Sequence, residues 1–436
     1  MKLNADGLVL TPYEMSADRV CLDCGRTYRV SDYLELSEHH FHRPTNYKNG
    51  CELNCLECWL GLTEFLKTPP KKNDPIEIEI SVPDSHEHWY NTDNYTSIDQ
   101  GDLVVAYREY FNSGCHLAVL PLSRLISDRS VFFPYGIMVY PEGRLDLKKI
   151  NLVSGQLNML ASTQAMASGV NLEQLSKHPL LVVPVKFSWE LLAHGSHNSH
   201  LEMISSLSQI VDALCFDLVN YINCELGQLS CERKPASPGQ LAYNPMMSAA
   251  LLIKSDAMDS VLLAGAAFTH MITKGLGLDL QQPEWDRFPQ NGEIGKLVTH
   301  ALSLYSQMLQ TQAATPKFIQ ALSLIEFLAY PDKYQSFKKV KTIVSRYVTQ
   351  CPAERKSILD RFEELTGKKD EVTGEEKGLR TNIVHIGARL EDLVKNRSER
   401  EKIFRELDVY IRAIIDHMIK FSYMSYDEYE VIKDNM

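Results

Sequence analysis

The stretch that decides the fold of the C-terminal part is GLRTNIVHIGARLEDLV, Gly378–Val394. On one helix, a single apolar stripe would contain Ile383, Ile386, Leu390, Leu393 and Val394. His385 lies about 140° from the centre of this stripe, so the pattern predicts that it points away from the protein core against which the helix packs. Arg380 lies on the flank of the stripe, in the first turn, where its long side chain could swing towards the histidine.

This Arg–His pair has two interpretations. An R-x4-H spacing alone is common and favours a solvated surface pair. The alternative is a catalytic pair, because a histidine moves protons near neutral pH and a fixed guanidinium stabilises charge on a phosphate. RNA cleavage needs both a base and an acid, which one pair does not supply. Two copies of the pair in a symmetric dimer would supply both.

The surrounding sequence favours the catalytic interpretation. The segments FIQALSLIEFLAYPDKYQSFKKVKTIV (Phe318–Val344), RFEELTGKKD, GLRTNIVHIGARLEDLV and REKIFRELDVYIRAIIDHMI (Arg400–Ile419) carry a resemblance. Together they resemble the Apea-like family of the HEPN superfamily (higher eukaryote and prokaryote nucleotide-binding domains), whose signature is R-x4–6-H. The likeness is confined to the C-terminal region of the chain.

The resemblance implies an α-helical domain that forms a homodimer and cuts RNA without a metal ion, in anti-phage defence or a toxin-like response. The 2′-hydroxyl would attack the scissile phosphate in a cleft between the subunits. On this view Arg380 binds the phosphate and His385 transfers protons. Thr381 follows the arginine, where active members often carry Asn, Asp or His. Because some members are inactive, a non-catalytic RNA-binding or dimerisation module of a larger complex is the alternative.

Five cysteines lie close together near the start of the chain. Cys21 and Cys24 form one CxxC pair, and Cys55 and Cys58 form a second. Four thiolates at this spacing are typical of a structural tetrahedral Zn²⁺ site. Cys51 completes a CxxxCxxC pattern, which is the spacing of radical S-adenosylmethionine enzymes that hold an iron–sulfur cluster. No clear series of βα units follows, so zinc is favoured, with unligated thiols as the remaining alternative.

The organisation of the chain predicts a multi-domain protein with an N-terminal zinc-binding module, a mixed α/β middle region and an all-α HEPN-like bundle. The expected boundaries are 1–70 for the zinc module, 76–200 for the α/β region, 201–290 for a helical connecting region and 291–436 for the HEPN-like domain. Strands are predicted at 76–82, 102–111, 131–140 and 179–187. Residues 248–272 are expected to form one or two helices, and further helices are expected near 293–311, 316–330, 335–350, 353–366, 377–395 and 399–422.

Charge and composition restrict the partners. The net charge is −11, which argues against general attraction to nucleic acid. Residues 331–436 carry 21 Lys and Arg against 20 Asp and Glu, so a phosphate-bearing ligand is permitted there. The start of the chain resembles no signal peptide, and the sequence contains no long apolar run and no P-loop. We expect a cytoplasmic protein that forms a homodimer or a higher homo-oligomer, with an RNA substrate, no membrane partner, no catalytic cofactor and a possible trigger or regulatory protein.

Overall fold

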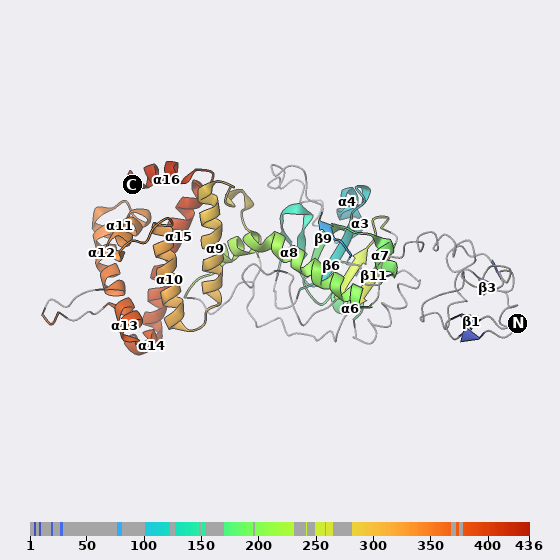
Figure 1. Cartoon of the computed structure of the whole chain (residues 1–436), viewed down its shortest axis with the longest axis horizontal. Helices are drawn as coiled ribbons and strands as arrows, with labels where there is room; N and C mark the ends of the chain where they lie inside the picture. The colour runs from blue at the N-terminus through green and yellow to red at the C-terminus, as the bar shows by residue number, and fades with distance from the viewer. Residues whose placement is uncertain are drawn as a thin grey trace.

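The computed structural model describes a mixed α/β part followed by a helical part (Figure 1). The described residues are 4–5, 8–9, 19–20, 27–28, 76–80, 101–122, 127–147, 150, 152, 170–194, 197–230, 241, 249–257, 259–264, 281–367, 372–374 and 378–436. The predicted combination of a mixed α/β region and a C-terminal helical region is confirmed. In the described part of the chain, no helix has the length and apolar character that a membrane span requires.

A seven-stranded antiparallel sheet forms the centre of the α/β part, with the order β11-β10-β6-β9-β8-β7 and β5 paired with β9. Its strands are β5 (Glu79–Ile80), β6 (His116–Pro121), β7 (Val131–Phe132), β8 (Met138–Tyr140), β9 (Leu180–Lys186), β10 (Ala249–Ile253) and β11 (Ser260–Ala264). Strands predicted at 76–82, 131–140 and 179–187 are therefore present, the second as the hairpin of β7 and β8.

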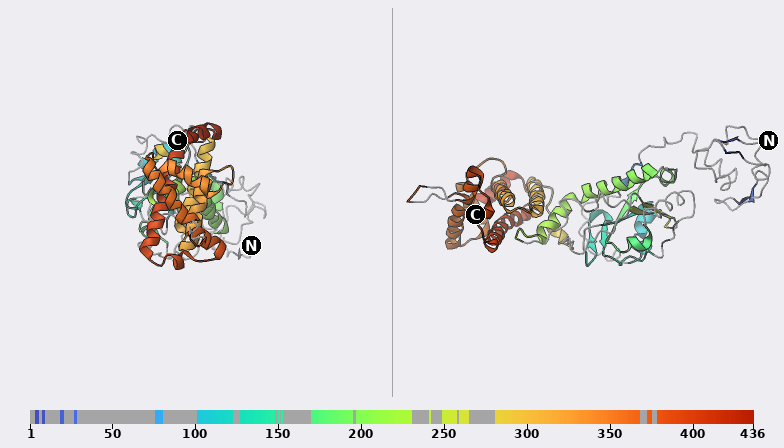
Figure 2. Two further views of the ribbon diagram at one scale, coloured as in Figure 1. Left: turned by 90° about the vertical axis from the view of Figure 1, so that its left-hand side faces the viewer. Right: turned by 90° about the horizontal axis from the view of Figure 1, so that it is seen from below.

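Both faces of the sheet are covered, because alternate residues of β6, β8, β9, β10 and β11 enter two separate cores. One core lies under α8 (His197–Leu226), which crosses one side of the sheet and continues to the helical part (Figure 2). The opposite core is closed by the short helices α3 (Leu103–Ala106), α4 (Arg108–Asn112) and α6 (Leu172–Leu175). The central strands are consequently apolar on both faces, which explains their continuous hydrophobic runs.

The strand predicted at 102–111 is wrong, because this segment forms α3 and α4. Asp102 begins α3 as its N-cap, and its side chain accepts hydrogen bonds from the backbone N–H groups of Val104 (3.1 Å) and Val105 (3.4 Å). The buried apolar residues recur at helical spacing, at Leu103, Ala106, Tyr107 and Phe111. The two valines that suggested a strand are exposed instead.

The helices predicted at 248–272 are also wrong where the structure describes this segment, because β10 and β11 form an antiparallel hairpin there. All ten residues of these two strands are buried. A short, fully buried apolar run has no periodicity that separates helix from strand. The turn between the strands has Ala257 at a positive φ of 58°, a conformation that the sequence does not mark with glycine.

The helical part consists of eight described helices, and the predicted ones are present with one change. They are α9 (Glu293–Gln310), α10 (Ala314–Ala329), α11 (Phe337–Val348), α12 (Pro352–Thr366), α13 (Leu379–Ile386), α14 (Leu390–Leu393), α15 (Arg397–Lys420) and α16 (Tyr426–Asp434). The helix predicted at 377–395 is two helices, α13 and α14. Helix α16 was not predicted from the sequence; Ser425 and Glu428 begin it with a capping box.

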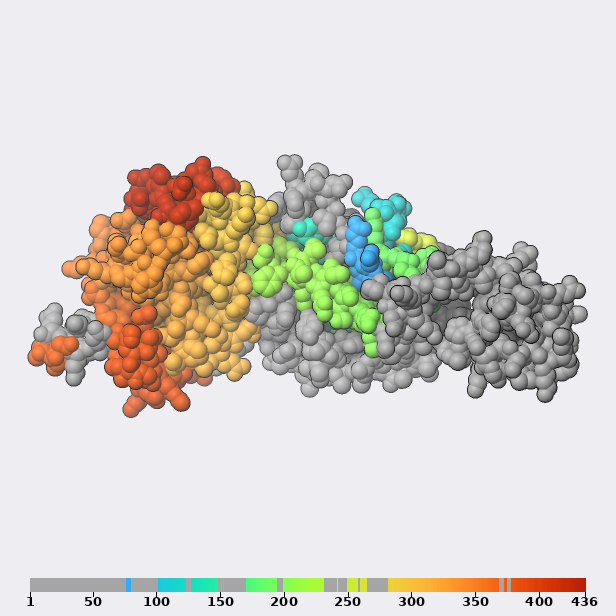
Figure 3. Space-filling model, in the orientation of Figure 1, coloured from blue at the N-terminus to red at the C-terminus, as the bar shows by residue number. Residues whose placement is uncertain are grey.

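A buried polar network joins the end of α8 to α9 and α15, and the surfaces of α8 and α9 adjoin in Figure 3. The Tyr305 hydroxyl donates to the Asp408 carboxylate at 2.6 Å, and Arg412 lies 3.4 Å from the same carboxylate oxygen. The Arg412 guanidinium donates to the Tyr305 hydroxyl at 2.9 Å and to the carbonyl of Gly227, just beyond α8. One apolar core continues through this junction, so the two parts pack as one structure.

This network leads to a stability prediction. Asp408 is 6% exposed, so Asp408→Ala removes the charge partner of Arg412 and the acceptor of Tyr305 in a buried place. We expect the free energy of unfolding to fall by about 2–4 kcal/mol, measured by urea denaturation. Asp416→Ala on the same helix is the control, because its 3.5 Å ion pair with Arg287 is half exposed and should contribute under about 1 kcal/mol. Equal losses for both variants would contradict this account.

Candidate functional site

Helix α13 carries both predicted catalytic residues and ends earlier than the sequence indicates. Its last residue is Ile386, and Gly387 follows in the left-handed conformation with φ of 77°. The N–H of Ala388 then donates to the carbonyl of Asn382 at 3.1 Å, which closes the helix in the manner of a glycine C-cap. The helix ends at this glycine, and α14 begins at Leu390.

The early end of α13 changes the predicted apolar stripe. Ile383 and Leu390 are buried, as the helical pattern indicates. Ile386 and Leu393 are 68% and 39% exposed, so their placement in the core is wrong. The predicted stripe assumes one continuous helix. The helix ends at Gly387, so residues before and after this glycine no longer share one face. Two apolar side chains are thereby left exposed, and one of them, Ile386, directly follows His385.

Arg380 lies half-buried in the first turn of α13 and packs on an aromatic ring. Its guanidinium carbon lies 4.7 Å from the centroid of the Phe337 ring, the first residue of α11. Its charge also acts on Glu326 of α10. Burial raises the pKa of the Glu326 carboxyl above its ordinary value, and the charge of Arg380 opposes this shift. A planar guanidinium over a ring and near a carboxylate is held in place, as a phosphate-binding group requires.

His385 lies near the other end of α13 and is exposed, in agreement with its predicted direction away from the core. Five residues along a helix correspond to a rise of about 7.5 Å and a rotation of about 140°. No hydrogen bond or ring contact between Arg380 and His385 occurs in the part of the chain that the structure describes. Within this chain the structure therefore places both residues on one short helix without bringing their side chains together.

Thr381 and Asn382, which follow the arginine, make hydrogen bonds to the backbone that stabilise the local fold. The Thr381 hydroxyl donates to the carbonyl of Thr366 at 3.0 Å, which fastens the start of α13 to the end of α12. The Asn382 amide donates to the carbonyl of Gly378 at 3.0 Å. A Cβ at Gly378 would lie 2.3 Å from the backbone of Gly367, so the two chain segments meet too closely for a side chain there. These contacts fix the position from which Arg380 extends.

Sequence reasoning missed Glu326 and Phe337 as neighbours of Arg380. Glu326 carries one detectable signal, since it is the only charged residue in the apolar run LSLIEFLAY. Phe337 has none, because its role depends on how α11 packs beside α13. Lys338 and Lys339 follow Phe337 with exposed side chains, so positive charge lies on the element that holds the guanidinium. The local charge around Arg380 therefore differs from the overall charge of −11.

The four predicted zinc ligands, Cys21, Cys24, Cys55 and Cys58, lie outside the described residues. The strands on either side of the first pair are described. β3 (Arg19–Val20) pairs antiparallel with β4 (Thr27–Tyr28), and the first CxxC lies between these two strands in the sequence. Within the described ranges, no cluster of three or more His, Cys, Asp or Glu side chains could hold a metal ion.

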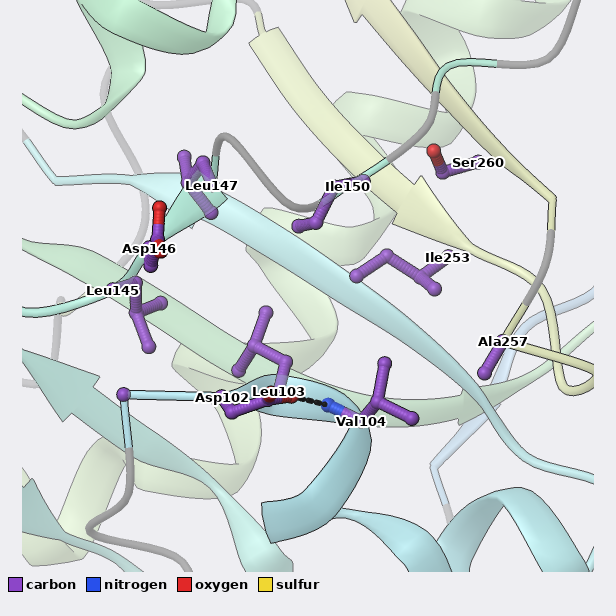
Figure 4. A pocket seen from close by; sticks show the side chains of 11 residues that line it. Asp102, Leu103, Val104, Leu145, Asp146, Leu147, Ile150, Ile253, Ala257 and Ser260 are labelled. Atoms are coloured by element: carbon purple, nitrogen blue, oxygen red, sulfur yellow. Dashed lines mark hydrogen bonds between the residues drawn. The ribbon is translucent and has the colours of Figure 1, made fainter.

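A separate hollow in the α/β part has a different character (Figure 4). Its volume is about 90 Å³, well below the roughly 300 Å³ at which small-molecule pockets begin. Its lining is mainly apolar, and the carboxylate of Asp102 already accepts the backbone N–H of Val104 (Figure 4). The lining residues are Gly101, Asp102, Leu103, Val104, Leu145, Asp146, Leu147, Ile150, Ile253, Ala257 and Ser260. It has fewer charged and polar groups for binding or catalysis than the surface around α13.

No protein-family model, curated protein or solved structure matches this chain. The resemblance to the HEPN family therefore stays a prediction from the quoted residues. The function is argued below from the geometry around α13.

Proposed function

We propose that the protein is a metal-independent endoribonuclease of the HEPN type. The observation that carries the proposal is the arrangement on α13. Arg380 is fixed on Phe337 beside Glu326, and His385 is exposed towards the end of the same short helix. A held guanidinium and an accessible imidazole are the two groups that 2′-hydroxyl attack on a phosphate requires.

In the proposed reaction the ribose 2′-oxygen attacks the adjacent phosphorus and the bond from phosphorus to the 5′-oxygen breaks. One His385 takes the proton of the 2′-hydroxyl, and a second protonated imidazole gives a proton to the leaving 5′-oxygen. Arg380 binds the non-bridging oxygens and stabilises the negative charge that develops on them. The products are a 2′,3′-cyclic phosphate and a 5′-hydroxyl.

A second copy of the chain supplies the second imidazole in this proposal. Val384 and Ile386 on either side of His385 are 47% and 68% exposed, and Leu393 on α14 is 39% exposed. Exposed apolar side chains near one another in the chain are typical of a surface that another protein covers. A two-fold axis through this surface would bring the two His385 residues into one cleft.

The N-terminal region is proposed to bind structural Zn²⁺ through Cys21, Cys24, Cys55 and Cys58. The pairing of β3 with β4, on either side of the first CxxC in the sequence, supports this, since paired short strands beside a CxxC are typical of zinc-binding modules. We expect elemental analysis of the purified protein to give about one zinc per chain and no iron. An iron-containing, brown sample would instead favour the iron–sulfur alternative.

The order of the regions suggests how the nuclease is used. The α/β part and the N-terminal region precede the helical part and would sense a trigger or restrain cleavage in a defence or toxin-like response. The junction of Gly227 with Tyr305 and Arg412 supports this idea, because it links α8 directly to α9 and α15. Movement of α8 would therefore reach the helical part through a buried contact.

A second candidate function is a non-catalytic RNA-binding or dimerisation module. One observation favours it. The Thr381 hydroxyl donates to the carbonyl of Thr366, so the residue after Arg380 does not provide the polar group that active HEPN members often carry at that position. Both candidates are tested by one experiment. The purified full chain is incubated with total RNA and with tRNA in EDTA, beside Arg380→Ala and His385→Ala. Cleavage by wild type alone supports the enzyme, and inert wild-type protein supports the binding module.

A further inference from the structure

His116 is buried at the start of β6 and binds backbone groups of two other segments. Its side chain is 7% exposed. The Nδ1 atom accepts a hydrogen bond from the backbone N–H of Ser255 at 2.8 Å. The Nε2 atom lies 3.1 Å from the backbone carbonyl oxygen of Phe187, just beyond β9. Because Ser255 belongs to the turn between β10 and β11, the imidazole connects this turn to β6.

The two partners of His116 determine the protonation state of its ring. A backbone N–H only donates, so Nδ1 carries no proton, and a backbone carbonyl only accepts, so Nε2 carries one. The neutral ring with its proton on Nε2 satisfies both partners. An imidazolium has N–H groups at both nitrogens and would turn one of them towards the N–H of Ser255. Two buried donors that face each other are unfavourable, so protonation of the ring and the bond to Ser255 exclude each other.

Aromatic rings surround the imidazole. The ring centroids of Phe187 and of Trp189, the first residue of α7 (Trp189–His194), lie 4.5 Å and 5.4 Å from that of His116. Burial lowers the pKa of His116 below its ordinary value, because an imidazolium loses its hydration there, and the bond to the Phe187 carbonyl opposes this shift. Val185 of β9 lies opposite His116, so the neighbouring Lys186 points to the other face of the sheet.

Charged groups of both signs act on His116 from the turn and from α7. Lys254 of the turn lowers the pKa of His116 further, whereas Asp256 of the same turn and Glu190 of α7 raise it. Lys254 is itself paired with Asp256 at 3.1 Å and with Asp259 at 3.3 Å. The ion pairs therefore hold the cation and the carboxylates of the turn close to the imidazole.

The turn between β10 and β11 is closed by its own backbone bonds. The N–H of Lys254 donates to the carbonyl of Asp259 at 2.8 Å, and the N–H of Ala257 donates to the carbonyl of Lys254 at 2.8 Å. Ala257 has a positive φ of 58°, which is unfavourable for a residue other than glycine. The hydrogen bond to His116 adds a contact from outside the turn that helps to hold this conformation.

The same turn forms one wall of the hollow in Figure 4. Ile253, Ala257 and Ser260 line the hollow from β10, the turn and β11, and Leu103 and Val104 of α3 line it from another side (Figure 4). A displacement of the turn would therefore change the shape of this hollow.

We propose that His116 is a pH-sensitive switch that holds the turn between β10 and β11 while its ring is neutral and releases the turn when the ring is protonated. The switch lies in the α/β part and does not depend on the proposed nuclease. After release, the nearby carboxylates of Asp256 and Glu190 stabilise the imidazolium. Acidification thereby opens the wall of the hollow to solvent.

The direction of the pH effect follows from the two states of the turn. In the closed state the pKa of His116 is lowered, so the open state binds the proton more tightly. Opening should therefore become more favourable as the pH falls below about 6.5, the ordinary pKa of histidine. One proton is involved, so the opening constant rises by up to about tenfold for each pH unit in this window. Above the window both states are neutral and His116 confers no pH dependence.

Hydrogen–deuterium exchange of the full chain, followed by mass spectrometry of its peptides, measures this opening directly. The rates are compared at about pH 7.5, 6.5 and 5.5 after correction for the intrinsic effect of pH on exchange. We expect the protection of peptides that cover the turn to fall by about threefold to tenfold between pH 6.5 and 5.5. Peptides that cover β6 and β9 should keep their protection over the same range.

Two variants identify the group that titrates. His116→Asn keeps an acceptor oxygen for the Ser255 N–H and has no group that binds a proton, so the protection of the turn should no longer depend on pH. His417→Asn is the matched control, because burial also lowers the pKa of His417 but this residue lies on α15. The turn should respond to pH in this variant as it does in wild type.

Three results would overturn the switch. The first is equal protection of the turn at all three pH values in wild type. The second is a pH response that persists in His116→Asn. The third is loss of protection in β6 and β9 together with the turn, which would indicate general unfolding in acid. If His116→Asn does not fold, the comparison of the turn with β6 and β9 in wild type still decides.

Discussion

Replacing His385 with alanine will reduce RNA cleavage by about a hundredfold or more while the protein keeps its thermal stability. In the proposed reaction the exposed imidazole transfers protons, and it packs against no core residue of the described part of the chain, so its loss should affect the reaction and not the fold. Arg380→Ala should cause a comparable loss through the charge on the phosphate. Its melting temperature should fall slightly, because the contact with the Phe337 ring is also removed. The measurement is the initial rate of cleavage of a labelled RNA in EDTA.

Two further variants separate charge from geometry. Arg380→Lys keeps the charge and loses the planar group that lies on Phe337 and grips two phosphate oxygens, so we expect partial activity. Arg405→Ala removes an exposed arginine from α15 and should leave the rate unchanged. If His385→Ala cleaves at the wild-type rate, His385 has no part in the mechanism. If Arg405→Ala loses as much as Arg380→Ala, the arginine effect is one of general charge.

Replacing Ile386 with glutamate is expected to convert a dimer into monomers and to reduce cleavage by a similar factor. Ile386 is 68% exposed next to His385, so the change should not disturb the fold of one subunit. In the proposed dimer it would bury two like charges at the two-fold axis without partners, which is strongly unfavourable. Light scattering coupled to gel filtration gives the mass, and the same labelled RNA gives the rate.

Val409→Glu is the matched control for the dimer surface. Val409 is 55% exposed on α15, and a glutamate there should change neither mass nor rate. A monomeric wild type that cleaves RNA at full rate would contradict the shared cleft. A dimeric Ile386→Glu protein with unchanged activity would place the dimer contact on another surface.

The helical part could be predicted from the sequence because its signals are local. The helices α9, α10, α11, α12 and α15 have helical apolar spacing and breaks at proline or polar segments, and their predicted bounds agree within a few residues. Gly387 was visible in the sequence, but a glycine inside an apolar pattern does not show whether the helix ends there. The structure shows that it does, through its left-handed conformation.

The sheet was harder to predict because its contacts are distant in sequence. β6 pairs with β9 and β10, which lie far along the chain, and the buried strands lack alternation. The environment of Arg380 was missed for the same reason, since Glu326 and Phe337 come from two other helices. The exposure of His385 was predictable, because it depends only on its angle from Ile383 within α13.

The most direct test of the central claim is the chemistry of the RNA ends. Wild-type protein is incubated with RNA in EDTA, and the fragments are tested for 2′,3′-cyclic phosphate and 5′-hydroxyl termini. The account predicts both termini with wild type and neither with His385→Ala. Fragments with 5′-phosphate ends, cleavage that depends on an added metal ion, or intact RNA at high protein concentration would contradict it.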